Sequence, residues 1–464
     1  MRTEHDFLGD REIPDDVYYG VQTLRALENF HITGVPISHT PSFIAGLGYV
    51  KKAAALANRD CGVLDVRIAD AIIGACDAVI DGVLDNQFVV DVIQGGAGTS
   101  TNMNANEVIA NKALELLGEP KGKYEVVHPN DHVNLSQSTN DAYPSAFRIT
   151  LYREMETLID ALALLQGAFE DKGREFADIL KMGRTQLQDA VPMTLGQEFD
   201  AFAVNVGEDI KRLQEARDLV TEINLGATAI GTSINAPAGY PPVAVKHLAE
   251  ITGIPLTLSQ NLIEATWDTG AYVQISGVLK RVAIKLSKIC NDLRLLSSGP
   301  RTGINEINLP KLQPGSSIMP GKVNPVIPEV VNQVCFLVIG NDVTVSFAAE
   351  AGQLQLNVME PVIAHCLFES IGTLTRACHT LRTKCVTGIT ANPEHARTMV
   401  LNSIGIVTAL NPILGYEVSA SIAKEAYETG GNIIDIVRQR KLLSEEKIAE
   451  VFSLDNLMHP RFIR

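Results

Sequence analysis

Residues 268–296 read DTGAYVQISGVLKRVAIKLSKICNDLRLL, and the fold class can be inferred from their spacing. Apolar side chains recur along this stretch at alternating steps of four and three residues, which places them on one face of an α-helix. They are Ile275, Leu279, Val282, Leu286, Ile289, Leu293 and Leu296. We therefore predict a helix from Asp268 to Leu296, about 43 Å long, that stops at Ser297-Ser298-Gly299-Pro300.

Further segments share this helical spacing. One has apolar residues from Leu151 to Phe169, and others occupy 65–86, 104–117, the region after Pro325, and 357–386. Long helices with such seams pack nearly parallel in bundles, so we predict an all-α fold built around a long-helix bundle. Seams this long exceed what one subunit covers, which favours a homo-oligomer. Beyond Gly388 the segments shorten, and we predict a small C-terminal domain there.

Composition limits the classes of function. The formal net charge is −15, which argues against nucleic-acid binding, because a phosphate backbone requires a basic face. The N-terminus lacks an apolar signal core, and no uninterrupted apolar run reaches about 18 residues, so we expect neither export nor membrane insertion. The seven cysteines lack CxxC spacing and no HExxH motif occurs, so we expect a cytoplasmic protein without disulfides or a zinc site.

Small hydroxyl, amide and glycine residues gather in four segments at predicted helix boundaries. These are QGGAGTSTNMN (94–104), SQSTND (136–141), GRTQLQD (183–189) and GSSIMPGKVNP (315–325). The first segment has neither the third glycine of a dinucleotide fingerprint nor the lysine of a P-loop. Helix N-termini with such side chains bind carboxylates well, although each segment taken singly is explained by helix capping or a turn.

These segments carry a family resemblance. The chain resembles the aspartase/fumarase superfamily nearly end to end, and GSSIMPGKVNP fits the signature loop of that family at every position. Three segments favour the aspartase branch over the fumarase branch. Fumarases typically read GSGTQ, SSND and GRTHLQD where this chain has GAGTS (96–100), STND (138–141) and GRTQLQD, with Gln186 in place of histidine. An amide cannot titrate, so Gln186 suits an amino group better than a leaving hydroxide.

The resemblance implies a reversible reaction in which L-aspartate loses ammonia to give fumarate through an aci-carboxylate intermediate. It assigns Ser316 as the general base, with Lys322 as a second catalytic residue that also holds the α-carboxylate beside Asn324. The other implied substrate-binding residues are Thr99, Ser138, Thr139 and Ser317 for the β-carboxylate, and Asn140, Thr185 and Gln186 for the amino group. Glycines at 315 and 321 would let the loop close over the substrate and exclude water.

The resemblance also implies an architecture. The family has three helical domains, which we place at 1–139, 140–393 (the central bundle) and 394–464. Its central helices form a twenty-helix core in a homotetramer, and each active site draws on three subunits. No cofactor or metal is expected to be required, although some family members respond to an activating divalent cation.

Two alternatives to the ammonia-lyase remain at this point. One is a fumarase-type hydratase acting on malate and fumarate, and the other is a catalytically silent structural member of the superfamily. Two lesser features also stay open. The region around His128 resembles a secondary anion site of fumarases but reads more simply as a turn, and Glu329 reads equally well as a helix-dipole partner. Ser233 stands where the family usually has glycine, so a positive φ there would carry strain.

Overall fold

The computed structural model describes residues 1–458 of the 464-residue chain. Its contacts divide the chain into two units. Unit 1 contains Met1–Ile159, Lys211–Arg281 and Phe336–Leu374, and unit 2 contains Asp160–Ile210, Val282–Cys335 and residues 375–458. The three domain boundaries implied by the family resemblance stay a prediction.

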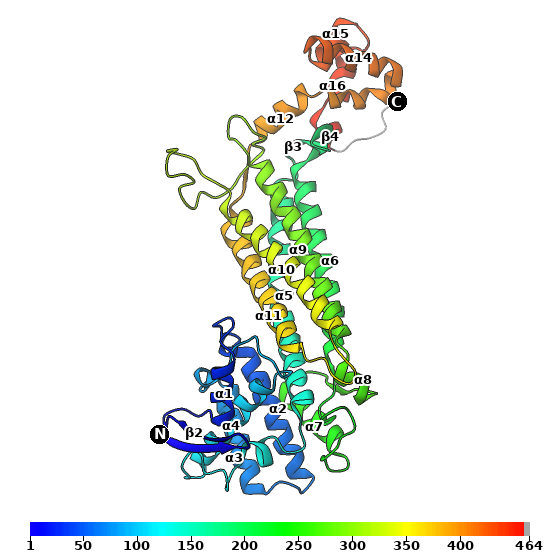
Figure 1. Ribbon diagram of the computed structural model, residues 1–464. Helices are drawn as coiled ribbons and strands as arrows, with labels where there is room; N and C mark the ends of the chain where they lie inside the picture. Colours follow the sequence, from blue (N-terminus) through cyan, green and yellow to red (C-terminus); the bar gives the residue numbers. More distant parts are fainter. Residues whose placement is uncertain (459–464) are drawn as a thin grey trace. The chain divides into compact units, whose positions relative to one another are not determined.

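Five long helices contribute residues to both units, and within each unit their segments run side by side (Figure 1). They are α5 (Thr139–Glu175), α6 (Leu195–Arg217), α9 (Gly270–Leu296), α10 (Val326–Glu350) and α11 (Glu360–Lys384). Every residue of the two predicted apolar seams, on α5 and α9, is buried. The mainly helical fold is thus confirmed, and α6 is a long helix that the spacing argument did not single out.

Unit 1 adds six shorter helices and two small sheets. The helices are α1 (Val21–Asn29), α2 (Pro41–Asp60), α3 (Val66–Ile80), α4 (Thr99–Leu116), α7 (Tyr240–Thr252) and α8 (Leu262–Trp267). Strands β1 (Arg2–Asp6) and β2 (Gly9–Ile13) pair antiparallel, whereas β5 (Glu222–Ile223) and β6 (Thr257–Leu258) pair in parallel. Aromatic rings of Phe43, Phe147 and Phe368 meet at centroid distances of 5.3 Å and join α2, α5 and α11.

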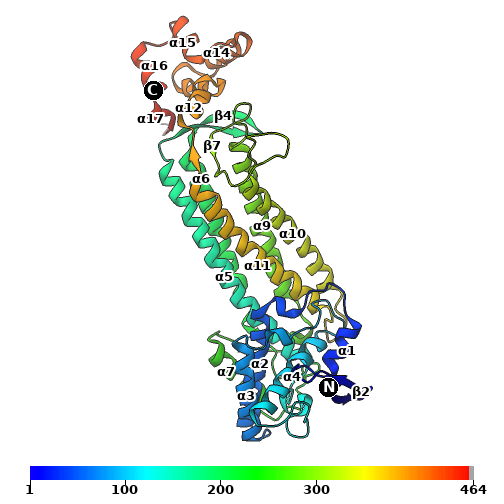
Figure 2. The same ribbon diagram turned by 90° about the vertical axis from the view of Figure 1, so that its left-hand side faces the viewer.

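Unit 2 adds the remaining helices and the other two sheets. The helices are α12 (Pro393–Asn402), α13 (Asn411–Leu414), α14 (Tyr416–Thr429), α15 (Ile433–Gln439), α16 (Glu445–Val451) and α17 (Leu454–Met458). Strands β3 (Leu180–Thr185) and β4 (Gln188–Thr194) form a hairpin, and β7 (Ile307–Asn308) pairs with β8 (Thr390–Ala391). Leu180 and Met182 of β3 share one apolar core with the C-terminal helices, which lie grouped near β4 in Figure 2.

The observed helix boundaries depart from the predicted ones where glycine intervenes. Helix α3 ends at Ile80, and Val83 is exposed beyond it, because Gly82 takes a positive φ of 76° and terminates the helix. Helix α4 begins at Thr99, five residues before the predicted start at Asn104. Ser233 has a φ of 56°, so the strain expected from the missing glycine is present in the loop before α7.

Helix α10 is the one helix among residues 1–458 that is long and apolar enough to cross a membrane by length and composition alone. Core helices pass the same test, and a third of its apolar window is buried. Polar bonds tie it to α9, since Asp342 accepts from Ser276 at 2.8 Å and from Lys280 at 2.6 Å. Length and composition therefore do not distinguish α10 from a core helix.

The buried carboxyl of Glu360, the first residue of α11, should make the stability of the protein depend on pH. Its side chain is 7% exposed, and burial raises the pKa of the carboxyl to about 8, with Arg148 acting in the opposite direction. A carboxyl whose pKa rises on folding contributes stability that is present below its unfolded-state pKa and is lost as the pH rises through the folded value. The wild type should therefore lose stability between about pH 5 and pH 8 faster than Glu360→Gln, by about 1 kcal/mol per pH unit.

Urea unfolding of both proteins across this pH range measures the difference. Glu350→Gln, at an exposed position near the end of α10, is the matched control and should follow the wild type. Parallel pH profiles of the wild type and Glu360→Gln would contradict the prediction.

Candidate active site

The first predicted binding segment, 94–104, forms a tight turn and then the start of α4. Gly96 and Gly98 both have positive φ, 93° and 87°. A Cβ atom at Gly98 would lie 2.4 Å from the Tyr143 ring, so no larger residue fits there. Thr99 is the first residue of α4, and its hydroxyl donates to the Gly96 carbonyl oxygen at 2.7 Å. The turn places Thr99 at the N-terminus of α4, where the helix dipole favours a bound carboxylate.

The second segment forms the start of α5. Ser138 precedes the helix and its hydroxyl oxygen accepts from the Asn140 backbone N–H at 3.2 Å. Thr139 accepts from the Asn102 side-chain amide at 3.1 Å, and the Asn140 side chain donates to the Ala229 carbonyl oxygen at 2.8 Å. These bonds hold three predicted substrate-binding side chains in defined orientations at a second helix N-terminus.

Ser138 and Thr139 line a cavity of about 370 Å³ in unit 1. Its other lining residues are Asn102, Met103, Asn134, Ser136, Gln137, Thr228, Ala229, Ile234 and Asn235. The amides of Asn102, Asn134 and Gln137 received no role from the sequence, although each lies within or beside a polar segment. In the sequence, each of the three is an amide near predicted site residues. The structure buries or half-buries each of them.

Two buried charges lie beneath this cavity. Asp141 is fully buried and accepts backbone N–H groups of Ser138, Gly226 and Thr228 at 2.8–3.1 Å. Burial raises the pKa of Asp141 to about 7, while these hydrogen bonds and Lys51 act in the opposite direction. Burial likewise lowers the pKa of Lys51 to about 7, against the attraction of Asp141. An acid and a base, both removed from solvent, therefore bond to residues that line the cavity.

The third segment is the β3–β4 hairpin of unit 2. Thr185 pairs with Gln188, which leaves Gln186 and Leu187 as a two-residue turn with φ of 55° and 61°. Such a turn normally uses asparagine or glycine, because both central residues need positive φ. Gln186 therefore sits at an exposed tip with a strained backbone, a feature that clusters at functional sites.

A buried ionic network anchors strand β3 of this hairpin. The Glu306 carboxylate is 1% exposed and accepts from Arg184 at 2.8 Å, with Lys181 at 3.3 Å. Lys181 also pairs with Glu198 at the start of α6. Because Arg184 directly precedes Thr185, the network fixes the strand from which the predicted binding residues project.

The fourth segment, 315–325, is a loop whose two ends are joined. The Gly315 N–H donates to the Lys322 carbonyl oxygen at 2.7 Å, and the Asn324 side chain donates to the Gly315 carbonyl oxygen at 2.8 Å. The residues between them, including Ser317, project from this neck and are mostly exposed. A projecting loop with a closed neck can move as one piece.

Within this loop the Ser316 side-chain oxygen accepts two hydrogen bonds. It accepts the backbone N–H groups of Ile318 at 3.2 Å and Met319 at 3.0 Å. Hydrogen bonds of this kind favour a negatively charged oxygen over a neutral one.

Lys322 and Asn324 also line a cavity of about 490 Å³ in unit 2, together with Arg294 and Lys311. The predicted site residues thus fall into two sets. Thr99, Ser138, Thr139 and Asn140 belong to unit 1, and the other six belong to unit 2. The structure gathers Ser138 with Thr139 in one cavity and Lys322 with Asn324 in another.

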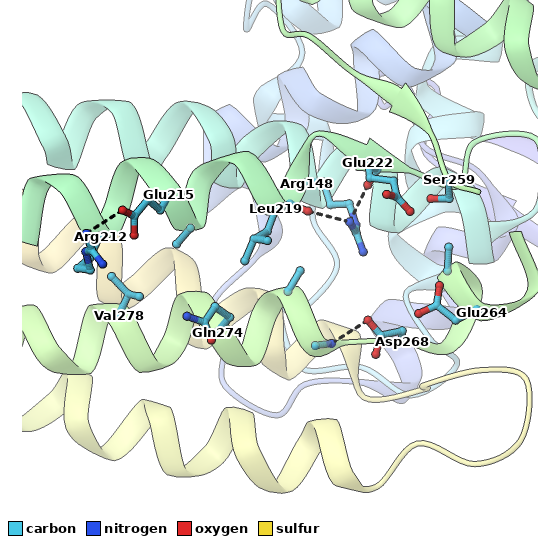
Figure 3. A pocket seen from close by; sticks show the side chains of 14 residues that line it. Arg148, Arg212, Glu215, Leu219, Glu222, Ser259, Glu264, Asp268, Gln274 and Val278 are labelled. Atoms are coloured by element: carbon cyan, nitrogen blue, oxygen red, sulfur yellow. Dashed lines mark hydrogen bonds and ion pairs between the residues drawn. The ribbon is translucent and has the colours of Figure 1, made fainter. Parts of the chain in front are cut away.

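A cavity of about 610 Å³ in unit 1 contains none of the predicted residues (Figure 3). The carboxylates on its wall are Glu215, Glu222, Glu264 and Asp268. Arg148 donates to the carbonyl oxygens of Leu219 and Glu222, and Arg212 pairs with Glu215 at 2.7 Å. Its cations are engaged and its acids outnumber them, so this cavity is a poor site for a dicarboxylate.

The residues that the structure describes contain no group of three or more His, Cys, Asp or Glu side chains that could hold a metal ion. The expectation that catalysis requires neither metal nor cofactor stays a prediction.

Comparison with known proteins identifies the family. A family model described as Lyase matches residues 9–340, and one described as Fumarase C C-terminus matches residues 406–459. An aspartate ammonia-lyase of Helicobacter pylori (strain J99) is 61% identical over 460 residues, which cover 99% of this chain and 98% of that protein. This chain belongs to the aspartase/fumarase superfamily.

Solved structures of superfamily members have the same fold. A fumarate lyase:delta crystallin from Brucella melitensis, bound to cobalt, is 56% identical, has a TM-score of 0.95, and covers 98% of each chain. A class II fumarase from Schistosoma mansoni is 34% identical, has a TM-score of 0.93, and covers 99% of each chain. The resemblance read from the four polar segments is confirmed, and this superfamily member is a lyase.

Proposed function

We propose that this lyase converts L-aspartate reversibly to fumarate and ammonia. One observation carries the proposal, namely the 61% identity over nearly the whole chain to a protein named aspartate ammonia-lyase. Identity to the class II fumarase is 34% at similar coverage. Gln186 agrees with this choice, because its neutral amide can hold an amino group but cannot supply a proton.

The hard step is removal of a proton from Cβ, beside a carboxylate that is already negative. The product is an aci-carboxylate with two negative charges, so donors must be in place before the charge develops. Thr99, Ser138 and Thr139 supply hydroxyls at the N-termini of α4 and α5, and Ser317 adds a fourth from the loop. Neutral donors at helix starts suit a protein whose net charge is −15, because long-range attraction cannot collect the substrate.

Ser316 acts as the base in this proposal. The N–H groups of Ile318 and Met319, 3.2 Å and 3.0 Å from its oxygen, stabilise the alkoxide. Ser316 first loses its hydroxyl proton to solvent. The alkoxide then takes the Cβ proton, and the C–H electron pair forms the double bond of the aci-carboxylate. Collapse of this intermediate forms the Cα–Cβ double bond, and the C–N electrons leave with ammonia. An aspartate ammonium group needs no further proton to leave as NH₃.

The loop 315–325 combines two tasks. Its neck holds Lys322 and Asn324, which bind the α-carboxylate, while Ser316 lies on the projecting part. Closure of the projecting part over bound substrate would bring the base to Cβ and remove water from the site.

We further propose a homotetramer whose sites combine segments from three subunits. Exposed apolar side chains on α10 support it, among them Phe336 (59% exposed) and Phe347 (72% exposed). Apolar surface of this kind on a long helix is typical of a subunit interface. The seven cysteines are free thiols, which agrees with a reducing cytoplasm.

Fumarate formation from L-aspartate and from L-malate, followed side by side by ultraviolet absorbance, tests the proposed reaction. We expect kcat/KM for L-aspartate to exceed that for L-malate by at least about 10²-fold. Preferential turnover of malate would assign the chain to fumarase chemistry, and turnover of neither substrate would indicate a silent structural member.

A further inference from the structure

Lys51 of α2 lies beneath the cavity that Ser138 and Thr139 line, and it is 0% exposed. Its ammonium group donates to three amide oxygens: Asn102 at 2.6 Å, Gln137 at 2.9 Å and Asn134 at 3.0 Å. Three acceptor oxygens around one nitrogen match the protonated form of Lys51, because an ammonium has three donors and no acceptor.

The lysine determines which way the Asn102 amide faces. Only an oxygen can face an ammonium, so the Asn102 NH₂ group must point the other way. That NH₂ group donates to the Thr139 hydroxyl oxygen at 3.1 Å and to the Asn134 side-chain oxygen at 3.1 Å. The Asn134 amide is oriented in the same way, with its oxygen toward Lys51, and this oxygen also accepts from Asn106.

The direction of the Thr139 hydroxyl hydrogen follows from this arrangement. Its oxygen accepts from Asn102, so the hydrogen must point elsewhere, and within residues 1–458 it donates to no acceptor. Thr139 lines the cavity. A hydroxyl that is forced to donate into a cavity is already oriented for an anionic ligand and loses no reorganisation energy on binding it.

We propose that Lys51 is a positioning residue that, through Asn102, orients the Thr139 hydroxyl toward the substrate β-carboxylate. The inference rests on the proposed function and extends it to a residue that contacts no substrate. The Thr139 bond strengthens as the carboxylate becomes a dianion, so the orientation acts on the transition state more than on the bound substrate.

Two substitutions break the chain of bonds at different points. Lys51→Met removes the three donors and keeps the length of the side chain. Asn102→Asp still offers oxygen to Lys51 but has no NH₂ group, so Thr139 can turn its hydrogen onto the new carboxylate. Each should lower kcat for L-aspartate by about 10²-fold, with KM changed less than about threefold.

A double-mutant cycle with Thr139→Val separates positioning from general damage to the fold. Once the hydroxyl is absent, adding Lys51→Met or Asn102→Asp should cost less than about threefold more, because coupled residues are not additive. A double variant whose loss of kcat equals the product of the two single losses would overturn the inference. Wild-type kcat in Lys51→Met would overturn it too. Where Lys51→Met fails to assemble, Lys51→Gln replaces it in the cycle.

Lys52→Met is the matched control, because the neighbouring lysine pairs with Asp77 of α3 at 2.5 Å and makes none of the bonds of the amide cluster. It should keep wild-type kcat. A wild-type protein that is inactive on L-aspartate would overturn the proposed function alone. The same cycle would then be measured on the affinity for 3-nitropropionate, whose nitronate form resembles the dianionic aci-carboxylate. Additive changes in that affinity would overturn the positioning role.

Discussion

Ser316→Ala is expected to lower kcat for L-aspartate by about 10²–10⁴-fold, the range for loss of a general base. The serine oxygen accepts hydrogen bonds from the Ile318 and Met319 N–H groups. Alanine has no oxygen in that place, so the loop no longer carries a base. KM should change little, because the α-carboxylate partners Lys322 and Asn324 remain at the loop neck. Initial rates of fumarate formation give both constants.

Ser421→Ala is the control for this experiment. Ser421 lies on α14, where its hydroxyl oxygen accepts from Arg440 at 2.9 Å, and its loss should leave kcat unchanged. Size-exclusion chromatography and thermal melting should show that Ser316→Ala assembles normally. A Ser316→Ala enzyme with wild-type turnover would remove Ser316 from the role of base and leave the elimination without an identified proton acceptor.

Mixing two inactive variants is expected to restore activity. One chain carries Ser138→Ala and Thr139→Val in unit 1, and the other carries Ser316→Ala in unit 2. Where one subunit supplies the α5 start and another supplies the loop, some mixed sites receive intact copies of both. With random assembly of a homotetramer, about a quarter of the sites should be complete. Co-expression with two different affinity tags isolates the mixed assemblies for the assay.

Two inactive variants in the same loop provide the control for mixing. Chains carrying Ser316→Ala and Lys322→Met should not complement, because one subunit supplies the whole loop and every site keeps one defect. Recovery in that control would mean that the two residues come from different subunits. Absence of recovery in the first mixture would place the whole site within one chain.

The long helices were predictable because their signal is local. Whether α9 forms depends on apolar residues three and four positions apart, and its observed start at Gly270 lies two residues from the predicted Asp268. The hairpin β3–β4 was not predicted, because its Gln186-Leu187 turn lacks the asparagine or glycine that marks such turns. Its strain is supported by contacts distant in sequence, among them the bond between Arg184 and Glu306.

The candidate site shows the same contrast. Thr99, Ser138 and Ser316 could be named from motifs, because each motif is a contiguous run with recognisable helix-start or loop chemistry. Lys51 could not, since in the chain it is one of two adjacent lysines on a helix and its neighbour Lys52 makes an ordinary surface ion pair.

The amino-acid order alone indicates a mainly helical member of a lyase superfamily, because helix spacing and loop motifs are properties of neighbouring residues. The role of Lys51 depends on folding, which packs α2 against the start of α4 and the residues before α5 and so surrounds one ammonium with three amide oxygens. Burial then matters more than residue type, because a charge removed from water must satisfy every hydrogen bond with whatever the fold places around it.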